Sequence, residues 1–491
     1  MILEHAQVLV VALPLLAVPV CALLPSRRWP GLFATLVAWA VLGLAILLIA
    51  GVAEQGVLRY QLGGWAPPWG IEYRLDAISA LVQLLVVLVA AVVFPYAARS
   101  LADEVDGERT AGVFAALLLL LTGLLGIVAT GDAFNVFVFL EISSLSGYAL
   151  IAMGRRRRAL VASFRYLIMG TVGATFFLIG LGLLYVLTGT LNMDDLASRM
   201  PALTASPTAQ TALVFIVVGL GLKAAIFPLH QWLPDAYAEA PPAVAAFMAA
   251  TATKVALYVL ARFLFGVFGL EQLLEVPALQ SALQGLAAAG MLAGSLLAMR
   301  AMDVGRILAL SSVAQVGYIL LGFALFSTAG LAAGLVHLFN HALMKGALFL
   351  ALGAIVHRLG SGDLSRLEGV AHAMPWTMAA FMMGALSLIG VPLTAGFVGK
   401  WYLILAVVEQ GQWWLVMAML VASILSVVYL WRIVEVLYRR PAVLPARHEA
   451  PALLLLPTLL LAVANLAMGM HATPLVEWSM RASASLLGAG S

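Results

Sequence analysis

The chain has 491 residues, of which 64% are hydrophobic and 10% are charged, and its formal net charge at pH 7 is +3. Its mean hydropathy of +1.06 lies far above that of soluble globular domains, which excludes a soluble enzyme and a nucleic-acid-binding domain. The single cysteine, Cys21, excludes a disulfide framework and a thiolate cluster for zinc or iron–sulfur ligation. We therefore expect an integral membrane protein with no cofactor and no metal site of its own.

Apolar runs of about 20 residues, each able to cross about 30 Å of hydrocarbon, recur along the whole sequence. They predict an all-α polytopic membrane protein with about 14 transmembrane helices. A cleaved signal peptide is not expected, because the first run opens with Glu4 and has no basic segment before it. The predicted spans cover residues 5–24, 31–51, 75–98, 111–129, 133–153, 163–188, 210–229, 241–264, 280–299, 305–326, 330–357, 374–408, 412–438 and 451–470.

The arginines between the spans predict the orientation of the chain. Seventeen arginines follow odd-numbered spans, and five follow even-numbered spans. Cytoplasmic loops carry the excess of basic residues, so both termini are expected outside the cell membrane of a bacterium or archaeon. The run Arg155–Arg158 is interpreted as a topology anchor at the lipid surface, with no role in nucleic-acid binding. The five arginines after even-numbered spans are Arg59, Arg74, Arg199, Arg262 and Arg481.

The loops themselves offer little chemistry. The longest exposed stretch, residues 51–74, contains Trp65 and Trp69 and is expected at the membrane interface. Asp76 and Asp132 lie near the ends of spans, where we expect solvated surface roles. The sequence has no phosphate-binding loop, so ATP-driven transport would need another chain.

All four lysines lie inside apolar runs, whereas nearly all arginines lie between them. A lysine at the bilayer centre costs about 2.5–3.5 kcal/mol on insertion scales, so four of them call for a functional reason. Arginine stays charged, but burial can push a lysine towards neutrality, and a lysine can therefore release and rebind a proton. The pattern predicts proton movement, with purely structural pairing as the alternative. The four residues are Lys223, Lys254, Lys345 and Lys400.

Glu141 is the one carboxylate that lies clearly inside a predicted span. A buried glutamate beside a lysine holds that lysine charged, and separation of the pair lowers the affinity of the lysine for its proton. Ion pairing and proton release would then be two states of one switch. A static buried salt bridge is the alternative.

His337, His341 and Lys345 are spaced i, i+4 and i+8 in the eleventh predicted span. This spacing places them on one face of a helix over about 12 Å of its length. Because histidine titrates near neutral pH, the three groups predict a proton relay. A hydrogen-bonded core is the alternative, and a metal site is not expected because no cysteine or carboxylate stands nearby.

Two spans are interrupted, the seventh at Pro228 and the twelfth at Pro392 and Gly396. A proline in mid-membrane removes a backbone donor, and irregular backbone at that depth occurs only where protein or water covers it. Paired broken segments in matching places of two halves indicate inverted repeats. We predict helices 1–3 in residues 1–110, helices 4–8 in residues 111–264, helices 9–13 in residues 280–438, and helix 14 with a tail in residues 451–491.

Three segments resemble one known family: Phe227–Asp235, His337–Lys345 and Gly390–Phe397. They look like the antiporter-type membrane subunits shared by respiratory complex I, the Mrp sodium/proton antiporters and membrane-bound hydrogenases. The resemblance covers about residues 75–440. It implies two inverted five-helix repeats with discontinuous helices 7 and 12. It also implies a polar axis through Glu141, Lys223, Lys254, the His337–Lys345 helix and Lys400, with proton intake near His230 and Asp235.

Within that family, the sequence looks most like the D-type subunit of an Mrp antiporter. Lys400 argues against the complex I subunit that carries a carboxylate at this place. Three positions depart from the family pattern. Gly305 stands where a lysine is common, Leu310 replaces a frequent tyrosine, and Tyr237 replaces a frequent histidine, which puts the usual proton intake in doubt.

The resulting hypothesis is a subunit that exchanges protons for a monovalent cation, with Na⁺ as the first candidate, together with other membrane subunits. The first alternative is a proton-pumping subunit of complex I or a hydrogenase. The second alternative is a membrane scaffold for a partner enzyme, such as a bicarbonate-forming complex. Without redox ligands of its own, the chain cannot separate the first two hypotheses.

Overall fold

The structure is a computed structural model that describes residues 2–25, 28–104, 109–203, 206–439 and 448–488. Three arginines used to predict the orientation, Arg27, Arg440 and Arg447, lie outside these residues. In the described ranges, thirteen helices are long and apolar enough to cross a membrane. One further crossing is split between α16 (Pro375–Ile389) and α17 (Ala395–Glu409). The predicted all-α architecture with 14 crossings is therefore confirmed.

The crossings follow one another in four groups along the chain. The first group contains α1 (Ile2–Leu23), α2 (Trp29–Gln55) and α3 (Ala77–Glu104). The second contains α4 (Thr110–Ala129), α5 (Ala133–Ala152), α6 (Arg158–Thr188), α8 (Pro207–Ala224) with α9 (Trp232–Glu239), and α10 (Pro242–Ala261). The third contains α12 (Pro277–Arg300), α13 (Val304–Ala324), α14 (Thr328–Leu359), α16 with α17, and α18 (Trp413–Tyr438). The last contains α19 (Ala452–Met470) and α20 (Thr473–Leu486).

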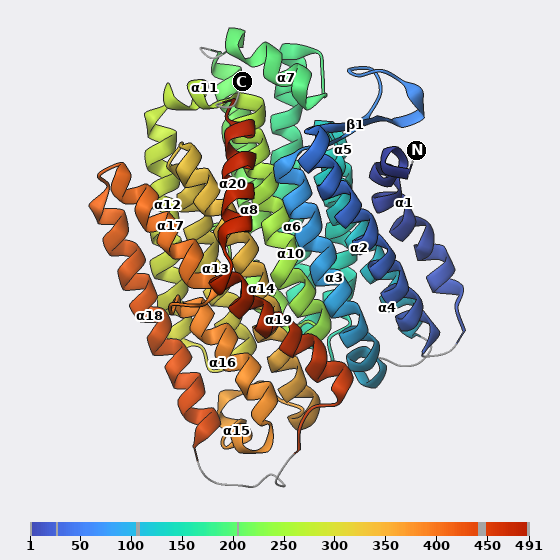
Figure 1. The fold of residues 1–491 in the computed structure, drawn as a ribbon, viewed down its shortest axis with the longest axis vertical. Coiled ribbons are helices and arrows are strands. Elements are labelled where there is room, and N and C mark those ends of the chain that lie inside the picture. The colour runs from blue at the N-terminus through green and yellow to red at the C-terminus, as the bar shows by residue number, and fades with distance from the viewer. Residues whose placement is uncertain (1, 26–27, 105–108, 204–205, 440–447, 489–491) are drawn as a thin grey trace.

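Short elements mark the two ends of the bundle. Both described termini lie at the upper end in Figure 1, which we call the terminal end. This end also carries α7 (Met193–Arg199), α11 (Leu270–Leu274) and an antiparallel hairpin of β1 (Leu58–Gln61) and β2 (Glu72–Leu75). The opposite end carries α15 (Val370–Ala373). We call it the arginine-rich end, because Arg156, Arg157 and Arg158 share a cavity there with Arg366.

The core of the bundle is formed by α10, α13 and α14. In the most apolar stretch of each of these spans, 94% or more of the residues are buried, whereas in α18 and α19 the share is 44% and 33%. A helix that is apolar all around is stable at the centre of a membrane bundle, where it contacts protein on every side. The buried polar residues of the three central helices therefore face other protein groups and not lipid.

The first helix break lies between α8 and α9, as predicted for the seventh span. Helix α8 ends at Ala224, and Ala225 has a left-handed backbone with φ of 57°. Pro228 lies within the irregular segment that follows, and α9 begins at Trp232. The indole nitrogen of Trp232 donates to the carbonyl of Leu222, 2.9 Å away, and so satisfies one of the backbone acceptors that the break leaves open.

The second break separates α16 from α17. Gly390 has φ of 93°, a conformation that favours glycine, and the segment up to Thr394 includes Pro392. Gly396 then brings α17 against the end of α16: its N–H donates to Ser387 Oγ at 3.0 Å, and a Cβ atom at this position would lie 1.8 Å from the Ser387 carbonyl oxygen. The break therefore needs a residue without a side chain at position 396.

We expect Gly396→Ala to destabilise the protein by more than about 1–3 kcal/mol, because the added methyl group overlaps backbone that cannot move aside. The measurement is the thermal unfolding midpoint of the purified protein in detergent. Gly182→Ala is the matched control, since Gly182 lies in α6 with open space around its Cβ position. Equal midpoints for the two variants would contradict the packing described for the second break.

One expectation is wrong, because it depends on a contact between distant segments. Asp76 does not lie on a solvated surface: it is buried against Arg262, which itself lies inside the bundle and not in a loop. Asp132 is partly buried and caps α5, with its carboxylate accepting from the Asn135 N–H at 2.7 Å.

The last crossing extends beyond its predicted end, because α20 continues from α19 after a bend at His471.

Candidate functional site

The candidate site begins at an ion pair between α5 and α8. Lys223 Nζ lies 3.3 Å from Glu141 Oε1 and donates to Ser144 Oγ at 2.7 Å. The lysine side chain is 4% exposed, whereas the glutamate side chain is 26% exposed. The lysine is therefore enclosed by protein, and the glutamate is partly accessible. Lys223 stands in the last turn of α8, where the helix dipole favours a cation. The structure thus brings together Glu141 and Lys223, two residues of the predicted axis.

A small cavity connects this ion pair with α10. The cavity measures about 20 Å³, and its lining includes Lys223, Ser144 and Ala252. This space is large enough for about one water molecule, and polar groups are available on the α5–α8 side to hold it. On α10 the cavity is lined by Ala252, Val255 and Ala256, which share one face of the helix, and Lys254 does not reach it.

Lys254 lies at the centre of α10 and is completely buried. Its ammonium donates to the carbonyl of Ala249 at 2.5 Å and lies 3.4 Å from Thr253 Oγ1. Both partners are neutral, and no ion pair involves Lys254 in the described residues. A buried ammonium without a carboxylate has a large desolvation cost that neutral oxygens offset only in part. Structural pairing, the alternative explanation for the lysines, therefore does not account for Lys254.

The three groups on α14 are brought into one column, as predicted. His337 and His341 have nearly parallel rings whose centroids are 6.3 Å apart. His337 Nε2 shares a hydrogen bond of 2.7 Å with Gln315 Oε1, whereas neither ring nitrogen of His341 meets a partner in the described residues. Lys345 Nζ donates to Ser311 Oγ at 2.5 Å and to the Leu308 carbonyl at 2.7 Å. All three side chains are completely buried.

Lys254 connects the two halves of the site. Helix α10 packs against α14, which carries His337, His341 and Lys345, and also against α8, which carries Lys223. Lys254 therefore lies on a helix that contacts both the helix of Lys223 and the helix of the α14 column, which is the position that a proton carrier between them would need.

Lys400 on α17 completes the axis next to the second break. Its ammonium donates to the last carbonyls of α16, Leu388 at 3.1 Å and Ile389 at 2.8 Å, and to Ser423 Oγ at 3.1 Å. It also lies 4.8 Å from the centre of the Tyr318 ring, and Tyr318 in turn contacts His337 with ring centroids 5.6 Å apart. Tyr318 thus joins Lys400 to the α14 column.

The structure adds neutral polar residues that the sequence analysis missed. Ser311, Gln315 and Tyr318 on α13 are buried and contact Lys345, His337 and Lys400 in that order. The sequence spacing indicates two of them: Ser311 and Gln315 are four residues apart in an apolar span and therefore lie on one face of the helix. Neutral polar residues are common in membrane helices, so this signal is weaker than that of a buried charge.

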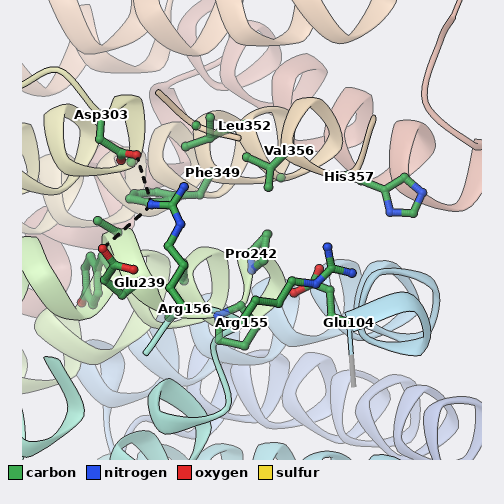
Figure 2. Close-up of a pocket in the computed structure, with 18 of the residues that line it drawn as sticks. Glu104, Arg155, Arg156, Glu239, Pro242, Asp303, Phe349, Leu352, Val356 and His357 are labelled. Carbon is green, nitrogen blue, oxygen red and sulfur yellow. Dashed lines mark ion pairs between the residues drawn. The ribbon is translucent and has the colours of Figure 1, made fainter. Parts of the chain in front are cut away.

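At the arginine-rich end, a cavity of about 180 Å³, which we call the vestibule, lies between α9, α13 and α14. Figure 2 shows Arg156 reaching between Glu239 and Asp303, at 4.0 Å and 3.9 Å. Burial raises the pKa of both carboxyls above their ordinary values, and Arg156 partly opposes these shifts. Phe349, one turn beyond Lys345 on α14, also lines the vestibule.

His230 and Asp235, the residues predicted for proton intake, line a second cavity of about 700 Å³ at the same end. Asp235 bridges Arg165 at 2.7 Å and Arg306 at 2.8 Å. The Nδ1 atom of His230 is buried and has no partner in the described residues. The two residues share a cavity but do not contact each other directly, and their role in proton intake stays a prediction.

The chain is similar to known proteins over most of its length. The family model described as NADH:quinone oxidoreductase/Mrp antiporter, TM, matches residues 130–426. The chain is 44% identical over 484 residues to NADH-quinone oxidoreductase subunit N of Desulforudis audaxviator, which covers 95% of this chain and 96% of that protein. It is 31% identical over 403 residues to the D subunit of the Na(+)/H(+) antiporter of Bacillus subtilis, which covers 81% of this chain and 79% of that protein.

Solved structures give the same result. A chain of the Mrp complex from Dietzia sp. superposes with a TM-score of 0.91 at 30% identity, which covers 100% of this chain and 98% of that chain. The match extends over both helix breaks and the whole axis, so the resemblance is not restricted to a few motifs. The chain therefore belongs to the family of antiporter-like membrane subunits shared by NADH:quinone oxidoreductases and Mrp antiporters.

Proposed function

We propose that this chain moves protons along the axis from Glu141 to Lys400 as one subunit of a multisubunit membrane complex. The observation that carries the proposal is Lys254, a completely buried lysine with neutral partners, on a helix that contacts both the helix of Lys223 and the helix of the α14 column. A buried lysine can serve as a proton carrier because it can exist without its charge, which arginine cannot do.

The geometry suggests an order of steps. While Lys223 is paired with Glu141, its proton is held in place; when the pair separates, the proton can pass towards Lys254 on the neighbouring helix α10. His341, with two ring nitrogens that have no partner in the described chain, can then accept and release it next to Lys345 and His337. Tyr318 and Lys400 continue the path beside the second break.

The arginine distribution supports an orientation in which the arginine-rich end faces the cytoplasm and both termini face outwards. Proton intake would then use the cytoplasmic cavities, with His230 and Asp235 in one and the carboxyls of the vestibule in the other. We also propose the repeat boundaries 111–264 and 280–438, because the fourth crossing of each group is the broken one.

The more specific proposal is that proton movement is exchanged for a monovalent cation, with Na⁺ as the first candidate. It is supported by the 31% identity to a protein named as the D subunit of a Na(+)/H(+) antiporter and by the match to an Mrp complex.

A second candidate function is proton pumping in a redox complex. It is favoured by the 44% identity, over 95% of the chain, to a protein named NADH-quinone oxidoreductase subunit N. In both cases this chain supplies the proton path, and the partner subunits supply the driving reaction. A role as a membrane scaffold alone would leave the axis without a use.

Purification of the native complex through a tag on this chain separates the proposals. Small membrane chains without iron–sulfur partners, together with Na⁺-dependent proton uptake in reconstituted vesicles, are expected for an antiporter. Co-purifying iron–sulfur subunits and proton uptake driven by electron transfer would instead establish the redox complex. An intact complex that moves no protons under either driving force would contradict proton translocation and leave the scaffold role.

A further inference from the structure

Helix α10, with the π-helical turn Arg262–Phe268 that continues it, carries a second polar column that branches from the proposed axis at Lys254. Lys254, Tyr258 and Arg262 follow one another at intervals of four residues, so they lie along one side of the helix over about 12 Å. Because α10 runs from the arginine-rich end towards the terminal end, this column leads from the centre of the axis straight to the terminal end. The route does not pass through α14 or Lys400.

A buried ion pair closes this column. Arg262 donates to both carboxylate oxygens of Asp76, at 2.6 Å and 2.7 Å, and also to the Tyr258 hydroxyl at 3.2 Å. Both charged side chains are almost completely enclosed, with 5% and 6% of their surface exposed. A bidentate guanidinium–carboxylate pair fixes both groups in one geometry, and it is the strongest form that such a contact takes. We call the Asp76–Arg262 pair the lock.

Beyond the lock, the charges continue outwards to solvent. Asp76 also accepts from Arg74 at 3.1 Å, Arg74 lies 3.2 Å from Asp194, and Asp194 contacts Arg59 on the surface. Exposure rises steadily along this chain, from 6% at Asp76 to 23% at Arg74, 36% at Asp194 and 47% at Arg59. Water can therefore approach the outer face of the lock, but not its inner face.

Below the lock, α3 carries a buried polar group that has no partner in the described residues. Gln83 stands seven residues after Asp76, and therefore two turns deeper on the same face of α3. Its side-chain nitrogen is buried and has no hydrogen-bond partner in the described residues. Helix α3 packs directly against α10. A residue with a purely structural role at position 83 would be apolar, because each buried polar atom without a partner has a desolvation cost.

We infer that the lock closes a second port to the proton axis, which would otherwise connect Lys254 with the terminal end. The inference rests on the proposed function, because it assigns Lys254 as the proton carrier on the inner side of the lock. With the lock closed, a proton on Lys254 continues to α14 and Lys400. With the lock open, it would escape through Tyr258 and Asp76 without performing coupled transport.

The test measures passive proton leak into vesicles that contain the complete complex, with a potassium diffusion potential as the only driving force and no coupling cation. Arg262→Gln and the nearly isosteric Asp76→Asn are each expected to raise the leak at least about tenfold over the unmodified complex. Adding Lys254→Ala should return the leak to the unmodified rate, whereas adding Lys400→Ala should leave it high. Asp194→Asn, which changes the charge chain outside the lock, is the matched control and should not leak.

Assembled Asp76→Asn and Arg262→Gln complexes with an unmodified leak would overturn the inference, and so would a leak that persists after Lys254→Ala. If Arg262→Gln fails to assemble, the Asp76→Asn result decides. The proposed function fails separately: it fails if Lys254→Ala alone leaves coupled transport intact, whatever the leak of the lock variants.

Discussion

Replacing Lys254 by arginine is expected to reduce proton transport by the assembled complex at least about 100-fold, although the positive charge is kept. Arginine cannot release its proton under any condition that a protein meets, so the carrier between the two halves of the axis would be lost. Lys254→Met should have the same effect for a different reason, because it removes both the charge and the proton. The measurement is the initial rate of proton uptake in vesicles reconstituted with the whole complex.

Thr251→Ala is the matched control for Lys254. Thr251 lies one turn earlier on α10, is completely buried, and donates its hydroxyl only to the Phe247 carbonyl of its own helix at 2.7 Å. We expect this variant to transport at close to the unmodified rate. If Lys254→Arg transports as fast as Thr251→Ala, the charge of Lys254 matters but its proton does not, and Lys254 is no carrier.

Glu141→Gln is expected to lower transport at least about tenfold, because Lys223 loses the partner whose separation would release its proton. Lys223 keeps its hydrogen bond to Ser144, so we expect the fold to survive. Removal of one partner from a buried pair costs about 3–5 kcal/mol, and the partial exposure of Glu141 should keep the loss of stability below that range. The thermal unfolding midpoint separates this loss from the loss of transport.

A double-mutant cycle checks that Glu141 and Lys223 act together. If they form one switch, Glu141→Gln combined with Lys223→Met should transport no more slowly than the slower single variant. Ser146→Ala serves as the control on α5, because Ser146 is buried and donates to the Ile142 carbonyl of the same helix at 2.7 Å. Independent, additive losses would show that the ion pair is a static contact.

The sequence reveals those residues of the site that have a high free-energy cost in a membrane span, whatever their neighbours are. A lysine in an apolar run, or a proline in the middle of a span, is unfavourable wherever the chain folds, so Lys254 and Pro228 stand out without any knowledge of their neighbours. The column of His337, His341 and Lys345 also follows from sequence, because helical spacing alone places the three groups together.

The parts that the sequence does not reveal depend on partners far apart in the chain. Asp76 and Arg262 each look like ordinary residues at the end of a span, and only the packing of α3 against α10 makes them a buried pair, 186 residues apart. Tyr318 likewise gains its place beside Lys400 through the contact of α13 with the second break. Both cases need the three-dimensional arrangement of helices, which spacing along one helix cannot supply.

In the proposed function, the Glu141–Lys223 pair and the α14 column belong to one continuous proton path. Single and double variants of Lys223 and Lys345 test this continuity. Initial proton uptake is measured for complexes with Lys223→Met, with Lys345→Met and with both, after equal assembly has been verified. A continuous path predicts that each single variant falls to the background rate and that the double variant is no slower. Two independent paths would leave about half of the transport in each single variant and abolish it only in the double, which would contradict the account.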